Sequence, residues 1–250
     1  MNLVTITDDG PVRTIRMNRP EKKNALTLDM YDAMAAGIAG VKHNAALRCV
    51  LIAGCPHDFC AGNDIGDFIS ASVKGGALGA PVIHFLDVLL HCDRPIVAAV
   101  QGHAVGIGTT MLFHCDYVIA STQARFSTPF VKLGVIPEAA STLIAPRMMG
   151  HARAFSLLVM GRPMNAEDAK QAGLVNMVVA PDAVEAEAMK AAQDIAELPP
   201  HGVAASRKLL RGSRDEVLAR MHEEFALFQA RLRTDEARTA FEAFLARKKA

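Results

Sequence analysis

Two short loops contain residues whose types and spacing could support catalysis by backbone amides. The first spans 58–65 (Asp-Phe-Cys-Ala-Gly-Asn-Asp-Ile) and the second spans 101–108 (Gln-Gly-His-Ala-Val-Gly-Ile-Gly). Each combines glycine with small residues after an apolar run, so each could turn sharply and leave backbone N–H groups free. Two such groups that converge would form an oxyanion hole. Glycine turns with no catalytic role would give the same pattern.

One carboxylate also attracts attention, Glu138, in the segment Leu-Gly-Val-Ile-Pro-Glu-Ala-Ala-Ser over 133–141. It follows a proline and is expected to open a helix. An acidic residue is favoured at that position by the helix dipole, whether or not it does chemistry. The pattern alone therefore leaves open whether Glu138 moves a proton.

Several other chemistries lack their signatures. The chain has no dinucleotide-binding Gly-x-Gly-x-x-Gly after a strand, no Walker-type Gly-Lys-Ser/Thr, no His-Glu-x-x-His and no Gly-x-Ser-x-Gly. The histidines do not show metal-ligand spacing, so we expect no metal site. The five cysteines include no Cys-x-x-Cys pair, and we expect them to be buried, reduced thiols.

The composition is that of an ordinary globular protein, with 51% hydrophobic and 21% charged residues. Lys plus Arg number 27 against 26 for Asp plus Glu, so the basic excess that nucleic-acid binding usually requires is missing. We find no secretory signal, no apolar run near the ~20 residues of a membrane span and no peroxisomal Ser-Lys-Leu ending. We therefore expect a cytoplasmic protein with neither nucleic-acid nor membrane partners.

The elements that position the two loops are predicted to be parallel strands. Four short runs are apolar on both faces, which is typical of a sheet covered on both sides: 49–53, 96–100, 117–120 and 175–179. The loops follow the first two runs, and ligands bind at the carboxyl ends of such strands. Residues 3–7 and 12–17 predict a hairpin. Thr27 is expected to cap the helix that follows it, and Asn165 to cap a shorter one.

The last part of the chain predicts only helices. The helical pattern begins near Ala183 and is broken by Pro199-Pro200. We interpret the chain as an α/β core over 1–198 followed by a helical region over 199–250. This region has more apolar positions than it could bury alone, so we expect it to pack on the core and on another subunit.

Three segments resemble the crotonase (enoyl-CoA hydratase/isomerase) family in sequence, order and spacing. They are Arg-Pro-Glu-Lys-Lys-Asn-Ala-Leu at 19–26, Phe-Cys-Ala-Gly-Asn-Asp-Ile at 59–65 and the run 94–108. Cys115-Asp116 and the segment 166–175 continue the match, which covers essentially the whole chain. The resemblance implies a crotonase-like spiral of ββα turns with a C-terminal helical trimerisation region. It also implies a homotrimer or a dimer of trimers.

The resemblance further implies an acyl-CoA thioester substrate, with coenzyme A as part of the substrate and no cofactor besides. The N–H groups of Asn63 and Ile107 would form the oxyanion hole. An exposed lysine such as Lys22 could meet a CoA phosphate, or could simply be solvated. The substrate-binding residues implied are Lys22, Asn24, Ala25, Leu26, Ala61, Gly62, Asn63, Asp64, Ile65, Gly106 and Phe130.

Family members differ in the position of the acid or base. Hydratases use two carboxylates to hold and polarise the water that is added, and the matching positions here are Thr110 and Phe130. The segment around Glu138 instead resembles the peroxisomal-type Δ3,Δ2-enoyl-CoA isomerases, in which a single glutamate shuttles the proton. This resemblance implies isomerisation of 3-enoyl-CoA to trans-2-enoyl-CoA with Glu138 as the base, and makes hydration improbable.

Alternatives remain at this point. A ring-opening isomerase of phenylacetate breakdown, or an aryl-CoA hydrolase or dehalogenase, could also use an acid near this loop, as a nucleophile in the latter cases. An enoyl-CoA hydratase is the less favoured alternative. A non-catalytic acyl-CoA-binding protein would need no acid, and Glu138 would then point away from the thioester.

Overall fold

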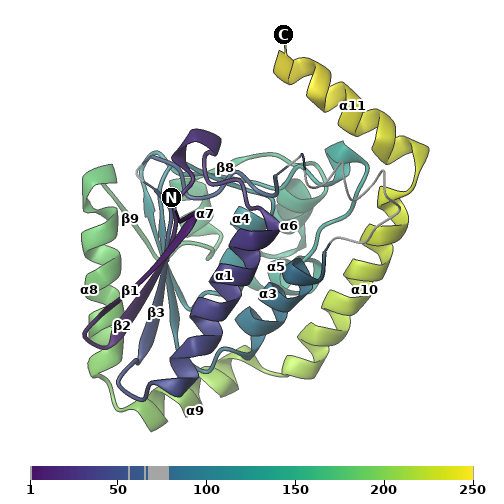
Figure 1. Ribbon diagram of the computed structural model, residues 1–250. Coiled ribbons are helices and arrows are strands. Elements are labelled where there is room, and N and C mark those ends of the chain that lie inside the picture. Colours follow the sequence, from purple (N-terminus) through teal and green to yellow (C-terminus); the bar gives the residue numbers. More distant parts are fainter. Residues whose placement is uncertain (1, 56, 65, 67–78, 250) are drawn as a thin grey trace.

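The computed structural model describes residues 2–55, 57–64, 66 and 79–249 (Figure 1). Its main sheet has six strands in the order β1-β2-β3-β4-β6-β9, and a second sheet has the order β5-β7-β8. The main-sheet strands are β1 (Val4–Asp9), β2 (Val12–Met17), β3 (Cys49–Ala53), β4 (Ile96–Val100), β6 (Tyr117–Ser121) and β9 (Met177–Val179). The others are β5 (His103–Val105), β7 (Arg125–Ser127) and β8 (Met164–Asn165).

The predicted strands of the main sheet are confirmed. β1 and β2 form the antiparallel hairpin, and β2, β3, β4, β6 and β9 follow one another in parallel. Every residue of β3 and of β4 is buried, as expected for central strands covered on both faces. β9 begins at Met177 rather than at 175, because the amide of Val175 still donates to Ala169 O at the end of the preceding helix. The second sheet, with strands of two or three residues, was not predicted.

Helices cover both faces of the main sheet (Figure 1). The helix α8 (Val184–Glu197) packs its alanine-rich stripe on β2, β3, β4 and β6, where Ala188 and Ala192 are fully buried. The helices α1 (Leu28–Ala39) and α3 (Ala80–His91) pack on each other in the larger core of the opposite face. The predicted cap of α1 is confirmed, since the Thr27 side chain accepts a hydrogen bond from Met30 N over 3.3 Å.

The remaining helices are short in the core and long at the C-terminus. In the core they are η1 (Pro20–Lys22), η2 (Gly40–His43), α4 (Ile107–Thr110), η3 (Met111–His114), η4 (Val131–Leu133), α5 (Ser141–Met149), α6 (His151–Leu158), α7 (Ala166–Gln171) and η5 (Pro181–Ala183). The predicted cap of α7 is confirmed, since Asn165 Oδ1 accepts from Asp168 N over 2.8 Å.

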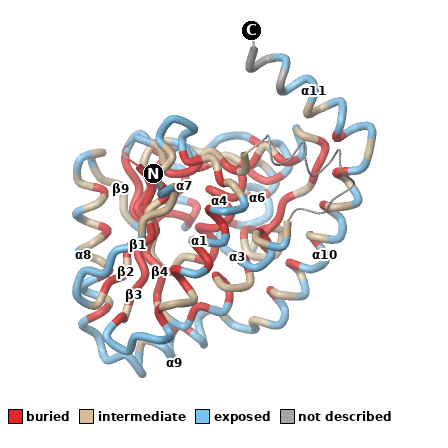
Figure 2. The backbone as a smooth tube through the Cα atoms, in the orientation of Figure 1, coloured by how far each residue is buried: buried red, intermediate tan, exposed pale blue. Residues whose placement is uncertain are grey.

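Residues 200–249 contain α9 (Pro200–Arg211), α10 (Arg214–Leu232) and α11 (Asp235–Lys249). α10 and the start of α11 lie against the loop 130–135, where Phe130 and Val135 form a small buried cluster with Phe228, Leu232 and Ala237. Much of α9 and α11 is exposed (Figure 2). Leu209 and Leu210 of α9 are 83% and 88% exposed, so this helix presents two large apolar side chains that the described chain does not cover. Among the described helices, none combines the length and apolar character that crossing a membrane requires.

Candidate functional site

The two predicted loops meet at the carboxyl ends of β3 and β4. They are joined as in a parallel sheet, because Cys60 N donates to His103 O over 2.9 Å and Val105 N donates to Cys60 O over 2.8 Å. Adjacent parallel strands end at the same edge, so loops that follow them become neighbours. The structure therefore brings together the two segments that the sequence singled out.

Two glycines allow the loops to approach this closely. A Cβ atom on Gly62, whose φ is +90°, would lie 3.0 Å from Val105 O. A Cβ atom on Gly108 would lie 2.6 Å from Cys60 O, a distance that side chains do not tolerate. These glycines are therefore required by the close contact of the two loops. A catalytic role of the loops is compatible with this requirement, because the same contact fixes the backbone amides that follow each glycine.

Asn63 and Ile107 present backbone N–H groups beside this contact. Leu26 N donates to Gly62 O and Asp64 N donates to Leu26 O, so the N–H of the intervening Asn63 must point to the opposite side of its strand. Ile107 is the first residue of α4, where backbone N–H groups lack intrahelical partners. No acceptor for either group is found among the described residues. As far as the described residues go, both amides are thus available to a ligand.

The Asn63 side chain has a partner that sequence reasoning missed. The Tyr31 hydroxyl donates to Asn63 Oδ1 over 2.5 Å, and Tyr31 is 1% exposed. Its ring also packs edge-on against Phe85 with centroids 5.3 Å apart. α1 thereby anchors the loop that carries the Asn63 amide. No signal in the sequence could have identified this pair, since the two residues are 32 positions apart.

The segment 22–26 lies against the first loop. Asn24 is fully buried: its Oδ1 accepts from Arg19 N, and its Nδ2 donates to Asp58 O and Phe59 O. The side chain of this predicted substrate-binding residue is therefore committed to the protein. Leu26 is buried as well, Ala25 is half-buried and Lys22 is exposed.

Three further predicted binding residues lie in the first loop. Ala61 and Asp64 are half-buried. Asp64 Oδ2 accepts from Arg19 Nη1 over 2.7 Å and its Oδ1 accepts from Gly66 N over 2.8 Å. Burial acts to raise the pKa of Asp64, but these hydrogen bonds outweigh it and the pKa is lowered. Ile65 lies outside the described residues.

Glu138 is a buried acid with one hydrogen-bonded oxygen and one unpartnered oxygen. Glu138 is only 9% exposed, and its Oε1 accepts a hydrogen bond from the Thr110 hydroxyl. Oε2 is buried and has no partner among the described residues. Burial raises the pKa of Glu138 from 4.5 to about 8, although the Thr110 hydrogen bond acts to lower it and the charge of Glu224 adds to the rise. Such an acid can take up and return a proton near neutral pH.

The expectation that Glu138 opens a helix is wrong. α5 begins three residues later, at Ser141. The intervening Ala139 and Ala140 have φ of 62° and 52°, so they lie in the left-handed region and cannot continue a right-handed helix. Glu138 is instead the first residue of a turn that Ser141 N closes by donating to Glu138 O over 3.1 Å.

The short helix α4 links Glu138 to the oxyanion loops. Ile107 is its first residue and Thr110 its last. Residues three apart share a helix face and are separated by roughly 4.5 Å along the axis. The hydroxyl that holds Glu138 therefore lies one turn away from the Ile107 amide, and Thr110 itself is fully buried.

Phe130 lies beside the N-terminus of α4. It is 6% exposed, and a Cβ atom on Gly106 would lie 3.8 Å from Phe130 Cε1. Gly106 is the N-cap of α4 with φ 56° and ψ −120°, a conformation that only glycine adopts readily. The Phe130 ring therefore lies beside Gly106, and the residue after Gly106 is Ile107, whose amide is a candidate oxyanion donor.

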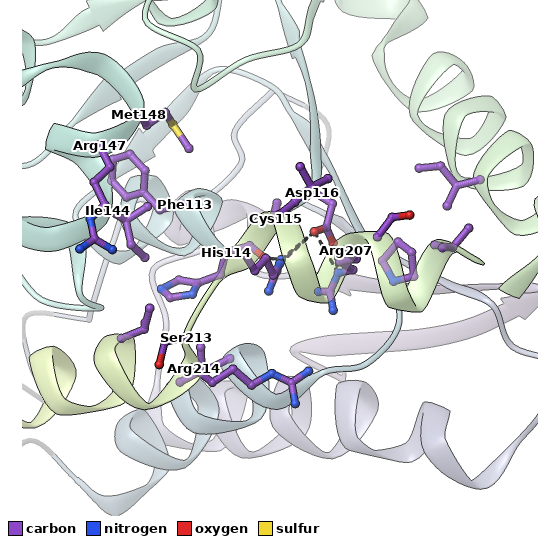
Figure 3. Close-up of a pocket in the computed structure, with 18 of the residues that line it drawn as sticks. Phe113, His114, Cys115, Asp116, Ile144, Arg147, Met148, Arg207, Ser213 and Arg214 are labelled. Atoms are coloured by element: carbon purple, nitrogen blue, oxygen red, sulfur yellow. Dashed lines mark hydrogen bonds and ion pairs between the residues drawn. The ribbon is translucent and has the colours of Figure 1, made fainter. Parts of the chain in front are cut away.

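A separate cavity of about 880 Å³ lies where α9 and α10 meet the core (Figure 3). Its walls combine apolar residues with charged ones, and Asp116 accepts hydrogen bonds there from Arg207 and Arg211. None of the predicted site residues that the structure describes lines it. His114, at its edge, is the link to the candidate site, because its Nε2 lies 2.8 Å from Ala139 O in the turn after Glu138.

The cysteines have no catalytic setting. Four of the five are buried and none forms a disulfide. Burial raises the pKa of Cys60, which belongs to the first loop, to about 12, so this thiol stays protonated at neutral pH. The expectation of buried thiols is confirmed for four of the five, and Cys115 is half-buried.

Comparisons with known proteins identify the family of this chain. A family model described as enoyl-CoA hydratase/isomerase matches residues 8–250. The chain is 34% identical over 250 residues to "Enoyl-CoA delta isomerase 2" of Rattus norvegicus, covering 98% of this chain but only 64% of the rat protein. It is 32% identical over 246 residues to a "Probable enoyl-CoA hydratase" of Rhizobium meliloti (strain 1021), covering 98% of this chain and 95% of that protein.

A solved structure shows the same fold. The enoyl-CoA hydratase/isomerase from Pseudoalteromonas atlantica T6c superposes with a TM-score of 0.92 at 39% identity, over 98% of each chain. The predicted α/β class with a crotonase-like core is therefore confirmed, while trimerisation stays a prediction. With two relatives of different printed activity at similar identity, the comparisons define the family and not the reaction. The chain belongs to the enoyl-CoA hydratase/isomerase family.

Proposed function

We propose that this chain is an acyl-CoA double-bond isomerase that converts 3-enoyl-CoA to trans-2-enoyl-CoA, with Glu138 as the only proton shuttle. The observation that carries the proposal is the state of the Glu138 carboxyl group. Thr110 holds one oxygen, while the other is buried and unpartnered within the described part of the chain. An unpartnered buried oxygen is costly, and a substrate proton would satisfy it.

Hydration is disfavoured because it needs a second free carboxylate. The two positions that carry hydratase acids hold Thr110, whose hydroxyl is occupied by Glu138, and Phe130, which is apolar. Glu224, the acid whose charge acts on Glu138, is already used: its oxygens accept from Ala140 N, Thr142 N and the Thr142 hydroxyl. A water that Glu138 polarised would find no partner carboxylate among these residues.

The chemistry then follows from these groups. The thioester oxygen accepts hydrogen bonds from the amides of Asn63 and Ile107. Glu138 Oε2 removes a proton from C2, and the two amides stabilise the dienolate as negative charge develops on the thioester oxygen. Glu138 returns the same proton to C4. One base suffices because C2 and C4 are two bonds apart on one face of the substrate.

The remaining assignments are part of the same proposal. Backbone groups of 22–26 and 61–64 line the coenzyme A moiety, and the exposed Lys22 meets a phosphate. Phe130 helps to keep water from the dienolate. Coenzyme A belongs to the substrate, and no other cofactor takes part. The assembly is a homotrimer or a dimer of trimers, with the uncovered leucines of α9 in a contact between subunits.

The direct test is incubation of the purified chain with 3-hexenoyl-CoA while the conjugated 2-enoyl thioester is followed by its ultraviolet absorbance. We expect conversion by the unchanged chain and a loss of at least about a thousandfold in kcat for Glu138→Gln, which keeps the shape but cannot accept the proton. Glu197→Gln is a matched control, because it makes the same change at an exposed residue of α8.

The same preparation should be offered trans-2-hexenoyl-CoA to measure hydration. If hydration is faster than isomerisation, the proposed isomerase would be rejected and the chain would be assigned as a hydratase. No conversion of 3-enoyl thioesters over a range of chain lengths would reject the isomerase, and full activity of Glu138→Gln would reject the role of Glu138.

A further inference from the structure

The turn that carries Glu138 has an unfavourable backbone conformation. Glu138 O and Ser141 N close it, and both central residues are alanines with positive φ, 62° for Ala139 and 52° for Ala140. Glycine and asparagine are the residues that suit such a turn. Alanine persists there only where other contacts hold the backbone in place. Those contacts converge on one peptide group, the one linking Ala139 to Ala140.

The carbonyl end of this peptide group is held by His114. His114 is 2% exposed and its Nε2 lies 2.8 Å from Ala139 O. Burial lowers the pKa of His114 to about 4, so the ring is neutral at pH 7. A carbonyl oxygen can only accept, so the neutral ring carries its hydrogen on Nε2 and donates it. His114 is the last residue of η3, which directly follows α4.

The amide end is held by Glu224, from a different part of the chain. Glu224 is 3% exposed on α10, and its Oε2 accepts from Ala140 N over 2.6 Å. Its Oε1 accepts from Thr142 N over 2.9 Å and from the Thr142 hydroxyl over 2.6 Å. Ala140 and Thr142 are at the start of α5, so Glu224 also supplies the acidic cap that the alanine N-cap cannot.

We propose that His114 and Glu224 are positioning residues for the proposed isomerase reaction: by holding opposite ends of the Ala139–Ala140 peptide group, they fix the turn that aims Glu138 at the substrate. The peptide group is planar, so its orientation is set once both ends are bonded. Without these bonds, rotation of this group would release Ala140 from its positive φ. Glu138, one residue before the rotating group, would lose its alignment with Thr110. This inference rests on the proposed function.

The helical C-terminal region thereby has a role inside the site. Glu224 lies 84 residues from Ala140 in the sequence, on the helix whose far end packs over Phe130. α10 is therefore part of the support of the catalytic turn, and not only a surface that could contact another subunit.

The test compares three variants with the Glu197→Gln control. Glu224→Gln replaces one acceptor oxygen with an amide that donates and removes the negative charge that strengthens the bonds, so the bond to Ala140 N is lost or weakened whichever way the amide is turned. His114→Phe keeps a ring but removes the donor, and His114→Gln keeps a donor near the position of Nε2. The first readout is a crystal structure of each variant. We expect Glu224→Gln and His114→Phe to show a rotated Ala139–Ala140 peptide group and a broken Glu138–Thr110 hydrogen bond.

The second readout is kinetic. For Glu224→Gln and His114→Phe we expect kcat for 3-hexenoyl-CoA to fall about a hundredfold, the usual effect of a misplaced catalytic group. Affinity for butyryl-CoA, which needs the oxyanion loops but no base, should stay within about twofold of the unchanged chain. His114→Gln should recover most of the kcat. Adding Glu224→Gln to Glu138→Gln should cause no further loss, because the positioning residue acts through Glu138.

Outcomes separate this inference from the proposed function. A retained Glu138–Thr110 hydrogen bond in both disruptive variants would overturn the inference whatever the activity, and so would a kcat loss matched by an equal loss of butyryl-CoA affinity. Absence of any isomerisation of 3-enoyl thioesters would reject the proposed function. The crystal structures would still show whether His114 and Glu224 hold the Ala139–Ala140 peptide group. If Glu224→Gln does not fold, the inference is tested by the loss of kcat in His114→Phe and its recovery in His114→Gln.

Discussion

Replacing Thr110 with valine should move the pH dependence of the enzyme upward. The Thr110 hydroxyl donates to Glu138 Oε1, and this hydrogen bond acts to lower the pKa of Glu138, which burial nevertheless raises to about 8. Valine keeps the branched shape of threonine at a fully buried position but removes the donor. The ionised carboxylate loses its only hydrogen bond among the described residues, so the protonated form gains.

The size of the shift follows from the strength of such a bond. A hydrogen bond to a charged group contributes about 1.5–3 kcal/mol, and one pKa unit corresponds to about 1.4 kcal/mol, so the pKa of Glu138 should rise by about 1–2 units. A base must be ionised to accept a proton. At pH 7 about a tenth of Glu138 is ionised when its pKa is about 8, and the variant should reduce this to about a hundredth or less. kcat/KM at pH 7 should fall about 10-fold to 100-fold.

The assay is kcat/KM for 3-hexenoyl-CoA at intervals between pH 6 and pH 10, for the unchanged chain and for Thr110→Val. The unchanged chain should show activity that rises with pH and levels off above about 8. The variant should level off at a higher pH, so the two curves should approach each other in alkaline solution. Identical inflections in the two curves would refute the reasoning, because Thr110 would then have no preference for the ionised carboxylate.

Three further predictions concern stability, the oxyanion loop and assembly. Because the pKa of Glu138 is about 8 when folded against 4.5 for an ordinary glutamate, the folded state keeps a proton that the unfolded state releases, and stability falls as pH rises from about 4.5 through 8. The melting temperature of Glu138→Gln should therefore exceed that of the unchanged chain by more at pH 9 than at pH 6, and an equal gap at both would contradict the buried acid. Gly106→Ala has room for its methyl group but not a suitable φ, so it should cost about 1–3 kcal/mol in urea unfolding and weaken butyryl-CoA binding, whereas unchanged binding would separate this loop from the site. Leu210→Asp on the exposed face of α9 should reduce the mass measured by light scattering from a trimer or hexamer towards a monomer, and an unchanged mass would exclude this face from the assembly.

Much of the molecule could be predicted from the sequence because local patterns determine it. Runs that are apolar on both faces predicted β3 and β4 with their bounds, since central parallel strands leave no polar face. Side-chain caps predicted the starts of α1 and α7, because these hydrogen bonds span only three residues. The two loops could be expected to meet because both follow adjacent parallel strands.

Long-range contacts decided the rest. β5, β7 and β8 contain two or three residues each, too few for a periodic pattern to be recognised. The turn after Glu138 has alanines at positive φ, and local preference predicted a helix there. His114 and Glu224 overrule that preference from 25 and 84 residues away.

The sequence by itself determined the family, the sheet, the two amide-bearing loops and the single carboxylate, because residue types and short spacings specify these features. Only the tertiary structure decided the chemical character of that carboxylate. Burial raises the pKa of Glu138, Thr110 binds one of its oxygens, and Glu224 is occupied by the start of α5. These properties depend on which groups surround the acid, and folding brings those groups together from three separate segments of the chain.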